Sequence, residues 1–262
     1  MNQPSPSVRS DAPLLEMHSI SKHFGGVMAV ADVSLHLNAG EALAIVGDNG
    51  AGKSTLIKVL TGVHELDEGE IRMEGRPVSI TNKRQSRQIG IEAVYQDLGL
   101  VDSLDAAGNV FLGHELKHRF LGLTFLDNAR MATEAARVLK EQVGIELEDI
   151  HVATHHLSGG QRQAVAIARA IYATDLKILV MDEPTAALGA EETRNTLMLM
   201  QNLKQQGIAL IVISHNLDHV FRIADRIMVM RSGRAVATLD RSTATKQDVL
   251  AHIVDAVETE AA

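Results

Sequence analysis

The nine residues GDNGAGKST, at positions 47–55, combine three glycines with a lysine and two hydroxyl side chains. They match the pattern G-x-x-x-x-G-K-[ST], whose glycines let backbone N–H groups surround phosphate oxygens. In this pattern Lys53 places its charge near the β- and γ-phosphates, and Ser54 can ligate Mg²⁺. A chance glycine-rich turn is the alternative. The residues expected to bind a nucleotide are Gly47, Asp48, Asn49, Gly50, Ala51, Gly52, Lys53, Ser54 and Thr55.

Two adjacent carboxylates follow an apolar run in ILVMDE, residues 178–183. Such a run predicts a buried strand, and ligands collect at the carboxyl ends of parallel strands. We expect Asp182 to hold Mg²⁺ and Glu183 to orient and deprotonate an attacking water. A helix-capping pair is the alternative, because DEPT also suits a helix start. The phosphate-binding pattern in the same chain favours the catalytic interpretation.

Two further segments carry polar groups. LSGGQRQ, residues 157–163, precedes an Ala-rich run and predicts a helix N-terminus whose unpaired N–H groups suit an anion. His215 ends the apolar run VIS and is expected to act as a hydrogen-bonding sensor of the γ-phosphate, although an ordinary polar strand end is the alternative. The spaced histidines His114 with His118 and His155 with His156 are weaker metal candidates, because no cysteine or carboxylate set completes a site.

The segments around these residues predict an α/β fold. Residues 41–47 form a short apolar strand before the phosphate pattern, and a helical pattern follows it to residue 62. Residues 177–184 and 208–215 are buried-type strands that flank a helical run at 191–206, which indicates a parallel sheet covered on both faces. Residues 71–80 and 227–238 predict antiparallel hairpins. Between residues 96 and 158 no buried strand is evident, and residues 128–143 favour a helix.

Composition sets limits on the function. The 262 residues are 45% hydrophobic and 22% charged, which is ordinary for a globular protein. The net charge of -8 argues against a dedicated nucleic-acid binder, and the absence of cysteine suits a reducing compartment. The first 13 residues, rich in Pro and Ser, predict a disordered leader. No apolar run reaches the roughly 20 residues that span a bilayer, so we expect any membrane role to depend on a partner.

The motifs together resemble an ATP-binding cassette (ABC) ATPase over about residues 14–240. GDNGAGKST, Gln96 in VYQD, LSGGQRQ, LVMDEPTAALG and VISH occur in the order of that family, and LSGGQ is its distinguishing element. The resemblance implies an α/β P-loop NTPase (RecA-like) core with a parallel sheet, an antiparallel β subdomain and a helical subdomain at about 97–164. The single ATPase domain would cover residues 14–245, and a helix and tail would follow at 246–262.

The resemblance also implies residue roles. Two chains would form a head-to-tail homodimer in which one chain's signature residues cap the γ-phosphate held by the other; these are Ser158, Gly159, Gly160 and Gln161. Gln96 would sense Mg²⁺ or the attacking water. Phe24 would stack on adenine, with a core aromatic as the alternative, and residues 97–113 would line a groove for a helix of a membrane subunit. The chain departs from the family at Gly189, where many members carry aspartate. The two sites therefore cannot communicate through that aspartate in this chain.

Within the family, the chain looks most like the ATPase subunits of bacterial monosaccharide importers of the ribose, xylose and fructose type. We therefore expect an ATP- and Mg²⁺-dependent ATPase at the cytoplasmic face of the inner membrane. Its expected partners are a second copy, membrane permease subunits and, indirectly, a periplasmic sugar-binding protein, with no nucleic acid. A non-transport ABC ATPase of the mechanical or DNA-repair kind is the alternative, and LSGGQ disfavours a lone phosphate-loop kinase or GTPase.

Overall fold

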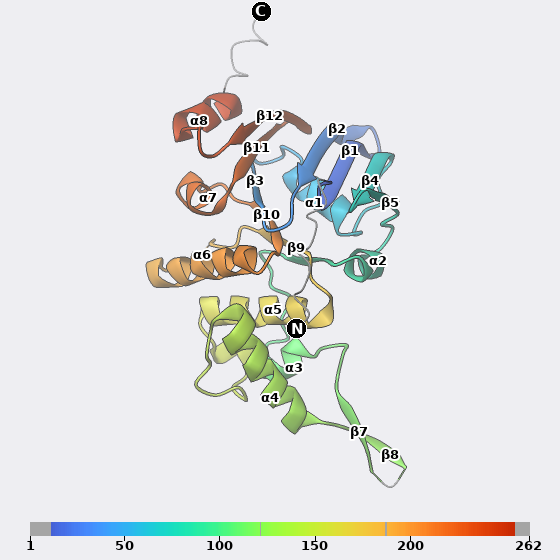
Figure 1. Ribbon diagram of the computed structural model, residues 1–262, viewed down its shortest axis with the longest axis vertical. Coiled ribbons are helices and arrows are strands. Elements are labelled where there is room, and N and C mark those ends of the chain that lie inside the picture. Colours follow the sequence, from blue (N-terminus) through green and yellow to red (C-terminus); the bar gives the residue numbers. More distant parts are fainter. Residues whose placement is uncertain (1–11, 121, 187, 255–262) are drawn as a thin grey trace, which may run out of the picture.

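The computed structural model describes residues 12–120, 122–186 and 188–254 (Figure 1). The predicted leader lies outside the described residues except for its last two positions, and so do residues 255–262 of the predicted tail.

A six-stranded sheet forms the centre of the core. Its strand order is β12-β11-β3-β10-β9-β6, and all neighbours are parallel except the β11–β12 hairpin. The predicted parallel sheet is thereby confirmed. The strands are β3 (Ala42–Val46), β6 (Ile91–Val94), β9 (Ile178–Asp182), β10 (Ala209–Ile213), β11 (Arg226–Arg231) and β12 (Arg234–Asp240).

Alternate residues of the central strands pack on opposite faces of this sheet, because side chains along a strand alternate in direction. In β9, Ile178 and Val180 join the apolar cluster that includes α1 (Lys53–Leu60), whereas Leu179 and Met181 join the cluster of the helical region. Both faces are therefore covered, which explains why these strands are continuous apolar runs in the sequence.

A second, antiparallel sheet packs over α1. Its order is β2-β1-β4-β5, and its strands are β1 (Leu15–Phe24), β2 (Val27–Leu37), β4 (Glu68–Met73) and β5 (Arg76–Val78). Apolar residues of α1, such as Leu56 and Leu60, belong to the same cluster as residues of both sheets. This packing fixes the start of α1 at the end of β3.

Helices make up most of the remaining structure (Figure 1). They are α2 (Lys83–Gln88), α3 (Ala106–Val110), α4 (Asn128–Val138) with a π-helical turn (Leu139–Val143), a 3₁₀ turn (Thr154–His156), α5 (Gly159–Ala173), α6 (Ala190–Gln205), α7 (Leu217–Ile223) and α8 (Lys246–Val254). The region between α3 and α4 also holds an exposed hairpin, β7 (Lys117–Phe120) and β8 (Leu123–Leu126), which the sequence pattern did not indicate. The subdomain bounds at about 97 and 164 stay a prediction, since α5 continues past residue 164.

Candidate functional site

The loop between β3 and α1 requires glycine at two positions where other backbone comes close. Gly47 has a φ of 144°, and a Cβ there would lie 2.0 Å from the carbonyl oxygen of Met230. Gly52 has a φ of 96°, and its Cβ would lie 2.5 Å from the carbonyl oxygen of Ala29. Both conformations are left-handed and suit glycine. The phosphate-binding pattern therefore forms a tight turn between strand and helix, as expected from its spacing.

Lys53, the first residue of α1, folds back over this loop. Its Nζ atom donates to the carbonyl oxygens of Gly47 at 2.7 Å and Asp48 at 2.8 Å. Burial lowers the pKa of Lys53, and the carboxylates of Glu183 and Asp182 oppose that shift. The ammonium group thus lies between the loop and the acids of β9, where it can neutralise a phosphate.

The two acids at the end of β9 differ in their surroundings. Burial, and next the negative charge of Glu183, raise the pKa of Asp182, while the charge of Lys53 opposes this. Glu183 takes a left-handed φ of 51°, which is costly for a residue with a side chain. Its N–H donates to the carbonyl oxygen of Ile213 at 2.9 Å, so the end of β10 holds this backbone in place.

Glu183 and His215 are direct partners. The Oε1 atom of Glu183 accepts from the backbone N–H of His215 at 3.1 Å and lies 2.8 Å from its Nδ1 atom. The His215 side chain is 76% exposed, whereas that of Glu183 is only 18% exposed. The imidazole can therefore reach a ligand while holding the carboxylate in one orientation.

A cavity of about 210 Å³ joins the acids to Gln96. Its walls include Gln96, Asp182 and Glu183, and also Gly159 at the start of α5. The structure thus brings Gln96 together with the two acids, and none of the described residues 47–55 lines this cavity.

The start of α5 is more fully bonded than the sequence suggested. Ser158 Oγ accepts from the N–H of Gln161 at 3.3 Å, and Gln161 Oε1 accepts from the N–H of Ser158 at 3.0 Å, which is a capping box. The expectation of unpaired N–H groups is therefore wrong for these two residues. Their side chains satisfy the terminus locally, so an anion would have to compete with the cap.

Glu192 is a residue near the signature that sequence reasoning missed. Its carboxylate accepts from the N–H of Gly189 at 3.1 Å and from the N–H of Gly160 at 3.4 Å. The first of these hydrogen bonds is the main cause that lowers the pKa of Glu192. One carboxylate thus links the start of α6 to the start of α5. The capping position of Glu192 in α6 was the only sequence signal for it.

Phe24 lies at the end of β1 and is 43% exposed. Its ring meets the edge of His64 with centroids 5.0 Å apart, and the Nζ atom of Lys22 lies 5.6 Å from its centroid. The alternative interpretation of Phe24 as a core aromatic is therefore wrong. An exposed ring of this kind can stack on a planar base.

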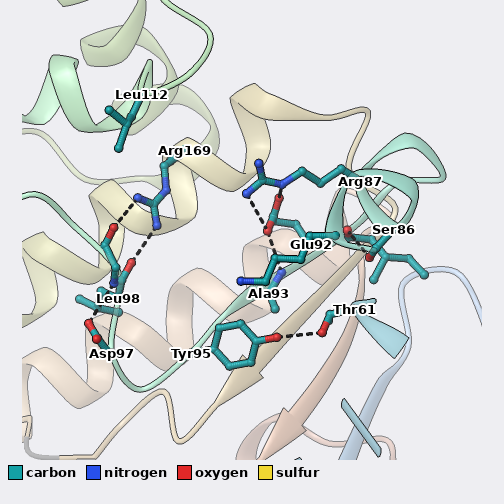
Figure 2. Close-up of a pocket in the computed structure, with 13 residues that line it drawn as sticks. Thr61, Ser86, Arg87, Glu92, Ala93, Tyr95, Asp97, Leu98, Leu112 and Arg169 are labelled. Atoms are coloured by element: carbon teal, nitrogen blue, oxygen red, sulfur yellow. Dashed lines mark hydrogen bonds and ion pairs between the residues drawn. The ribbon is translucent and has the colours of Figure 1, made fainter. Parts of the chain in front are cut away.

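A second cavity, of about 350 Å³, lies beside the segment that follows Gln96 (Figure 2). Asp97, Leu98 and Leu112 from the predicted groove segment line it. Arg169 of α5 donates to the carbonyl oxygens of Leu98 and Gly99, each at 2.8 Å (Figure 2). This bidentate contact ties the groove to the signature helix, and no sequence pattern pointed to it.

Within the described ranges, no three histidine, cysteine or carboxylate side chains form a cluster that could hold a metal ion. The rings of His155 and His156 lie 3.9 Å apart, and Nδ1 of His155 lies 2.9 Å from the carbonyl oxygen of Asp102.

Comparison with known proteins places this geometry in a family. The family model described as ABC transporter matches residues 30–186, which is more than half of the chain. The chain belongs to the ABC transporter ATPase family. This ABC ATPase is 43% identical to the fructose import ATP-binding protein FrcA of Rhizobium meliloti over 94% of this chain and 95% of that protein. It is also 43% identical to the xylose/arabinose import ATP-binding protein XylG of Sulfolobus acidocaldarius, over 85% and 86% of the two chains.

Other relatives are longer. The ribose import ATP-binding protein RbsA of Caldanaerobacter subterraneus is 40% identical over 92% of the ABC ATPase, which spans only 48% of that relative. An ATP-binding cassette of an ABC transporter in its ADP conformation superposes with a TM-score of 0.76 at 27% identity, over 92% and 94% of the chains. A dimeric bacterial ABC transporter cassette gives 0.71 at 25% identity, over 87% and 98%. These structures confirm the predicted P-loop NTPase fold.

Within the described part of the chain, no helix is both long enough and apolar enough to cross a bilayer.

Proposed function

We propose that this ABC ATPase powers a sugar importer, and that it works with Mg²⁺ as a head-to-tail homodimer bound to a permease at the cytoplasmic face of the inner membrane. The observation that carries the import proposal is the similarity to FrcA over nearly the whole of both chains. A fructose import protein of the same extent makes a simple sugar the favoured cargo. The sugar would be bound by partner proteins, including a periplasmic binding protein.

The residues at the ends of β9 and β10 support the proposed chemistry. Glu183, held by His215, would take a proton from the water that attacks the γ-phosphate. His215 itself is exposed enough to donate to that phosphate. Lys53 supplies the countercharge to the phosphates from the loop side.

The residues proposed to hold Mg²⁺ carry suitable donor groups. This ion prefers oxygen ligands, and Ser54, Gln96 and Asp182 offer a hydroxyl, an amide oxygen and a carboxylate. The raised pKa of Asp182 reflects burial and repulsion from Glu183, a cost that a cation would offset. When bound, Mg²⁺ would neutralise charge on the phosphates.

A comparison supports a site shared by two chains, because the ABC ATPase resembles a cassette whose solved structure is dimeric. We therefore infer that the partner's Ser158 and the glycines after it face the γ-phosphate held by residues 47–55, and that Phe24 stacks on the adenine.

The second cavity fits the proposed permease contact. Its lining includes the Arg87–Glu92 ion pair and Tyr95, whose hydroxyl is hydrogen-bonded to that of Thr61 at 2.8 Å (Figure 2). Arg169 connects this lining to α5. A permease helix seated here could therefore move the signature helix together with the segment after Gln96.

Lys53→Ala should weaken ATP binding by about 10- to 100-fold, because the phosphates lose charge-assisted hydrogen bonds. His215→Ala should leave binding within about threefold of wild type and chiefly slow hydrolysis, because the histidine acts through Glu183 and the γ-phosphate. Calorimetric titration with a non-hydrolysable ATP analogue, alongside ATPase rates, separates the two effects. Equal losses of affinity in both variants would show that His215 is misassigned.

The importer proposal is tested by reconstitution. The ABC ATPase would be co-expressed with the permease encoded beside it and placed in nanodiscs, and the ATPase rate measured with the cognate periplasmic binding protein. We expect sugar-loaded binding protein to stimulate the rate by at least about threefold over sugar-free protein. No permease complex, together with stimulation by DNA, would instead support the non-transport alternative.

A further inference from the structure

The β7–β8 hairpin is exposed along both strands. Every residue of Lys117–Phe120 and Leu123–Leu126 is exposed, and the hairpin projects away from the sheets beyond α3 and α4 (Figure 1). Phe120 and Leu123, which pair next to the turn, are each 63% exposed. Exposed apolar residues grouped in this way mark a contact surface more often than chance.

The two strands of the hairpin differ in character. β7 carries Lys117, His118 and Arg119 before Phe120, whereas β8 is mostly apolar, with Leu126 opposite Lys117 and Phe125 opposite His118. Between residues 117 and 126 there is no acid, although the chain as a whole carries a net charge of -8. Among the described residues, neither Lys117 nor Arg119 has a carboxylate within ion-pair distance, although the charge of Lys117 contributes to the lowered pKa of Glu115. The hairpin is thus a local cationic and apolar element on an acidic protein.

The base of the hairpin is firmly attached. The N–H of Asp127 donates to the carbonyl oxygen of Leu116 at 2.8 Å, which closes the hairpin, and the Asp127 carboxylate accepts from the N–H of Arg130 to cap α4. On one face the rings of His118 and Phe125 stack with centroids 6.0 Å apart. The element therefore presents its apolar end in a defined direction from α4.

We propose that this hairpin inserts its apolar end into the headgroup region of an anionic bilayer. Charge complementarity selects this occupant: anionic headgroups attract Lys117 and Arg119, while the layer beneath accepts Phe120 and Leu123. Lys117 lies three residues before Phe120, which at about 3.3 Å per residue is about 10 Å, comparable with the depth reached by interfacial apolar side chains, whereas Arg119 directly precedes Phe120. The inference rests on the proposed function only in requiring that the ATPase works beside a membrane.

Vesicle binding tests the proposal on the full chain without a permease. Flotation with vesicles of phosphatidylserine and phosphatidylcholine should show binding at least about tenfold stronger than with phosphatidylcholine alone. Phe120→Ser combined with Leu123→Ser, and separately Lys117→Gln combined with Arg119→Gln, should each weaken binding by about tenfold or more. Leu250→Ser combined with Val254→Ser is the matched control, because these residues are 47% and 60% exposed on another element, α8; it should bind as wild type.

The basal ATPase rate of all three double variants should match wild type in the absence of vesicles, which shows that the fold is intact. Failure of wild type to bind anionic vesicles, or an equal loss in the control, overturns the proposal. Wild-type vesicle binding by the hairpin variants, with loss of permease association, also overturns it and identifies the permease as the occupant. Vesicle binding that follows the expected pattern without sugar-stimulated ATPase activity would keep this inference and reject sugar import.

Discussion

Glu183→Gln should lower the ATPase rate by about 10²- to 10⁴-fold, the range that general-base catalysis contributes. Glutamine keeps the shape of the side chain but cannot take a proton from water. The left-handed backbone at Glu183 and its hydrogen bond to Ile213 do not depend on the carboxylate, so the fold should survive. Phosphate release under saturating ATP measures the effect.

Glu191→Gln is the matched control for this variant. Glu191 lies in the first turn of α6 and is exposed, so it changes the same net charge without touching the cavity. Its rate should equal that of wild type.

Because Glu183→Gln should still bind ATP, the trapped nucleotide should also hold two chains together. Light scattering would show this as a doubled mass in the presence of ATP. Wild-type turnover by Glu183→Gln would contradict the assignment of the base.

Ser158→Arg should abolish most ATPase activity while leaving ATP binding to single chains within about threefold of wild type. The reason is geometric, since Ser158 is exposed at the start of α5 and a bulky cation there would block closure onto a partner. Part of any effect comes from the lost helix cap, which costs about 1 kcal/mol. Ser158→Ala removes the same cap without the bulk, so thermal unfolding of both variants separates stability from blocked closure.

The parts of the fold that sequence predicted best were those with strong, redundant signals. The strand ending at Asp182 is apolar on both faces because both faces are covered, and the five-residue strands β3 and β10 show the same pattern. The loop at residues 47–55 was equally clear, because the close approaches at Gly47 and Gly52 leave no room for a side chain. In this strand and this loop, the types of neighbouring residues in the sequence determine the local structure.

Other features depend on contacts between segments that lie far apart in the chain. The Glu192 link to Gly160 and the Arg169 contact with Leu98 join residues 32 and 71 positions apart, and nothing in their neighbouring sequence reports the partner. The β7–β8 hairpin was missed for a different reason. Its strands are exposed on both faces, so they lack the alternation of apolar and polar residues that identifies a half-buried strand.

The absence of aspartate at Gly189 bears on how the two proposed sites communicate. Glu192 accepts from the N–H of Gly189 and from that of Gly160, so a side chain from α6 contacts the signature turn where the family's aspartate is missing. Movement of this segment would therefore be passed to α5 within the same chain. We expect hydrolysis itself to survive without that aspartate.

Mixing two inactive variants is the most direct test of a site built from two chains. Ser158→Arg chains keep the phosphate loop, and Lys53→Ala chains keep the signature, so a heterodimer has one site with both halves intact. Neither parent homodimer has such a site. An equal mixture should recover up to about one quarter of the wild-type rate, since about half of the dimers are mixed and each has one of two sites. The ATPase rate is measured across mixing ratios, with heterodimers verified by tagged pull-down and the permease present. Recovery that peaks near equal mixing is the predicted result, whereas verified heterodimers that stay inactive while Ser158→Arg alone is fully active would contradict the two-chain site.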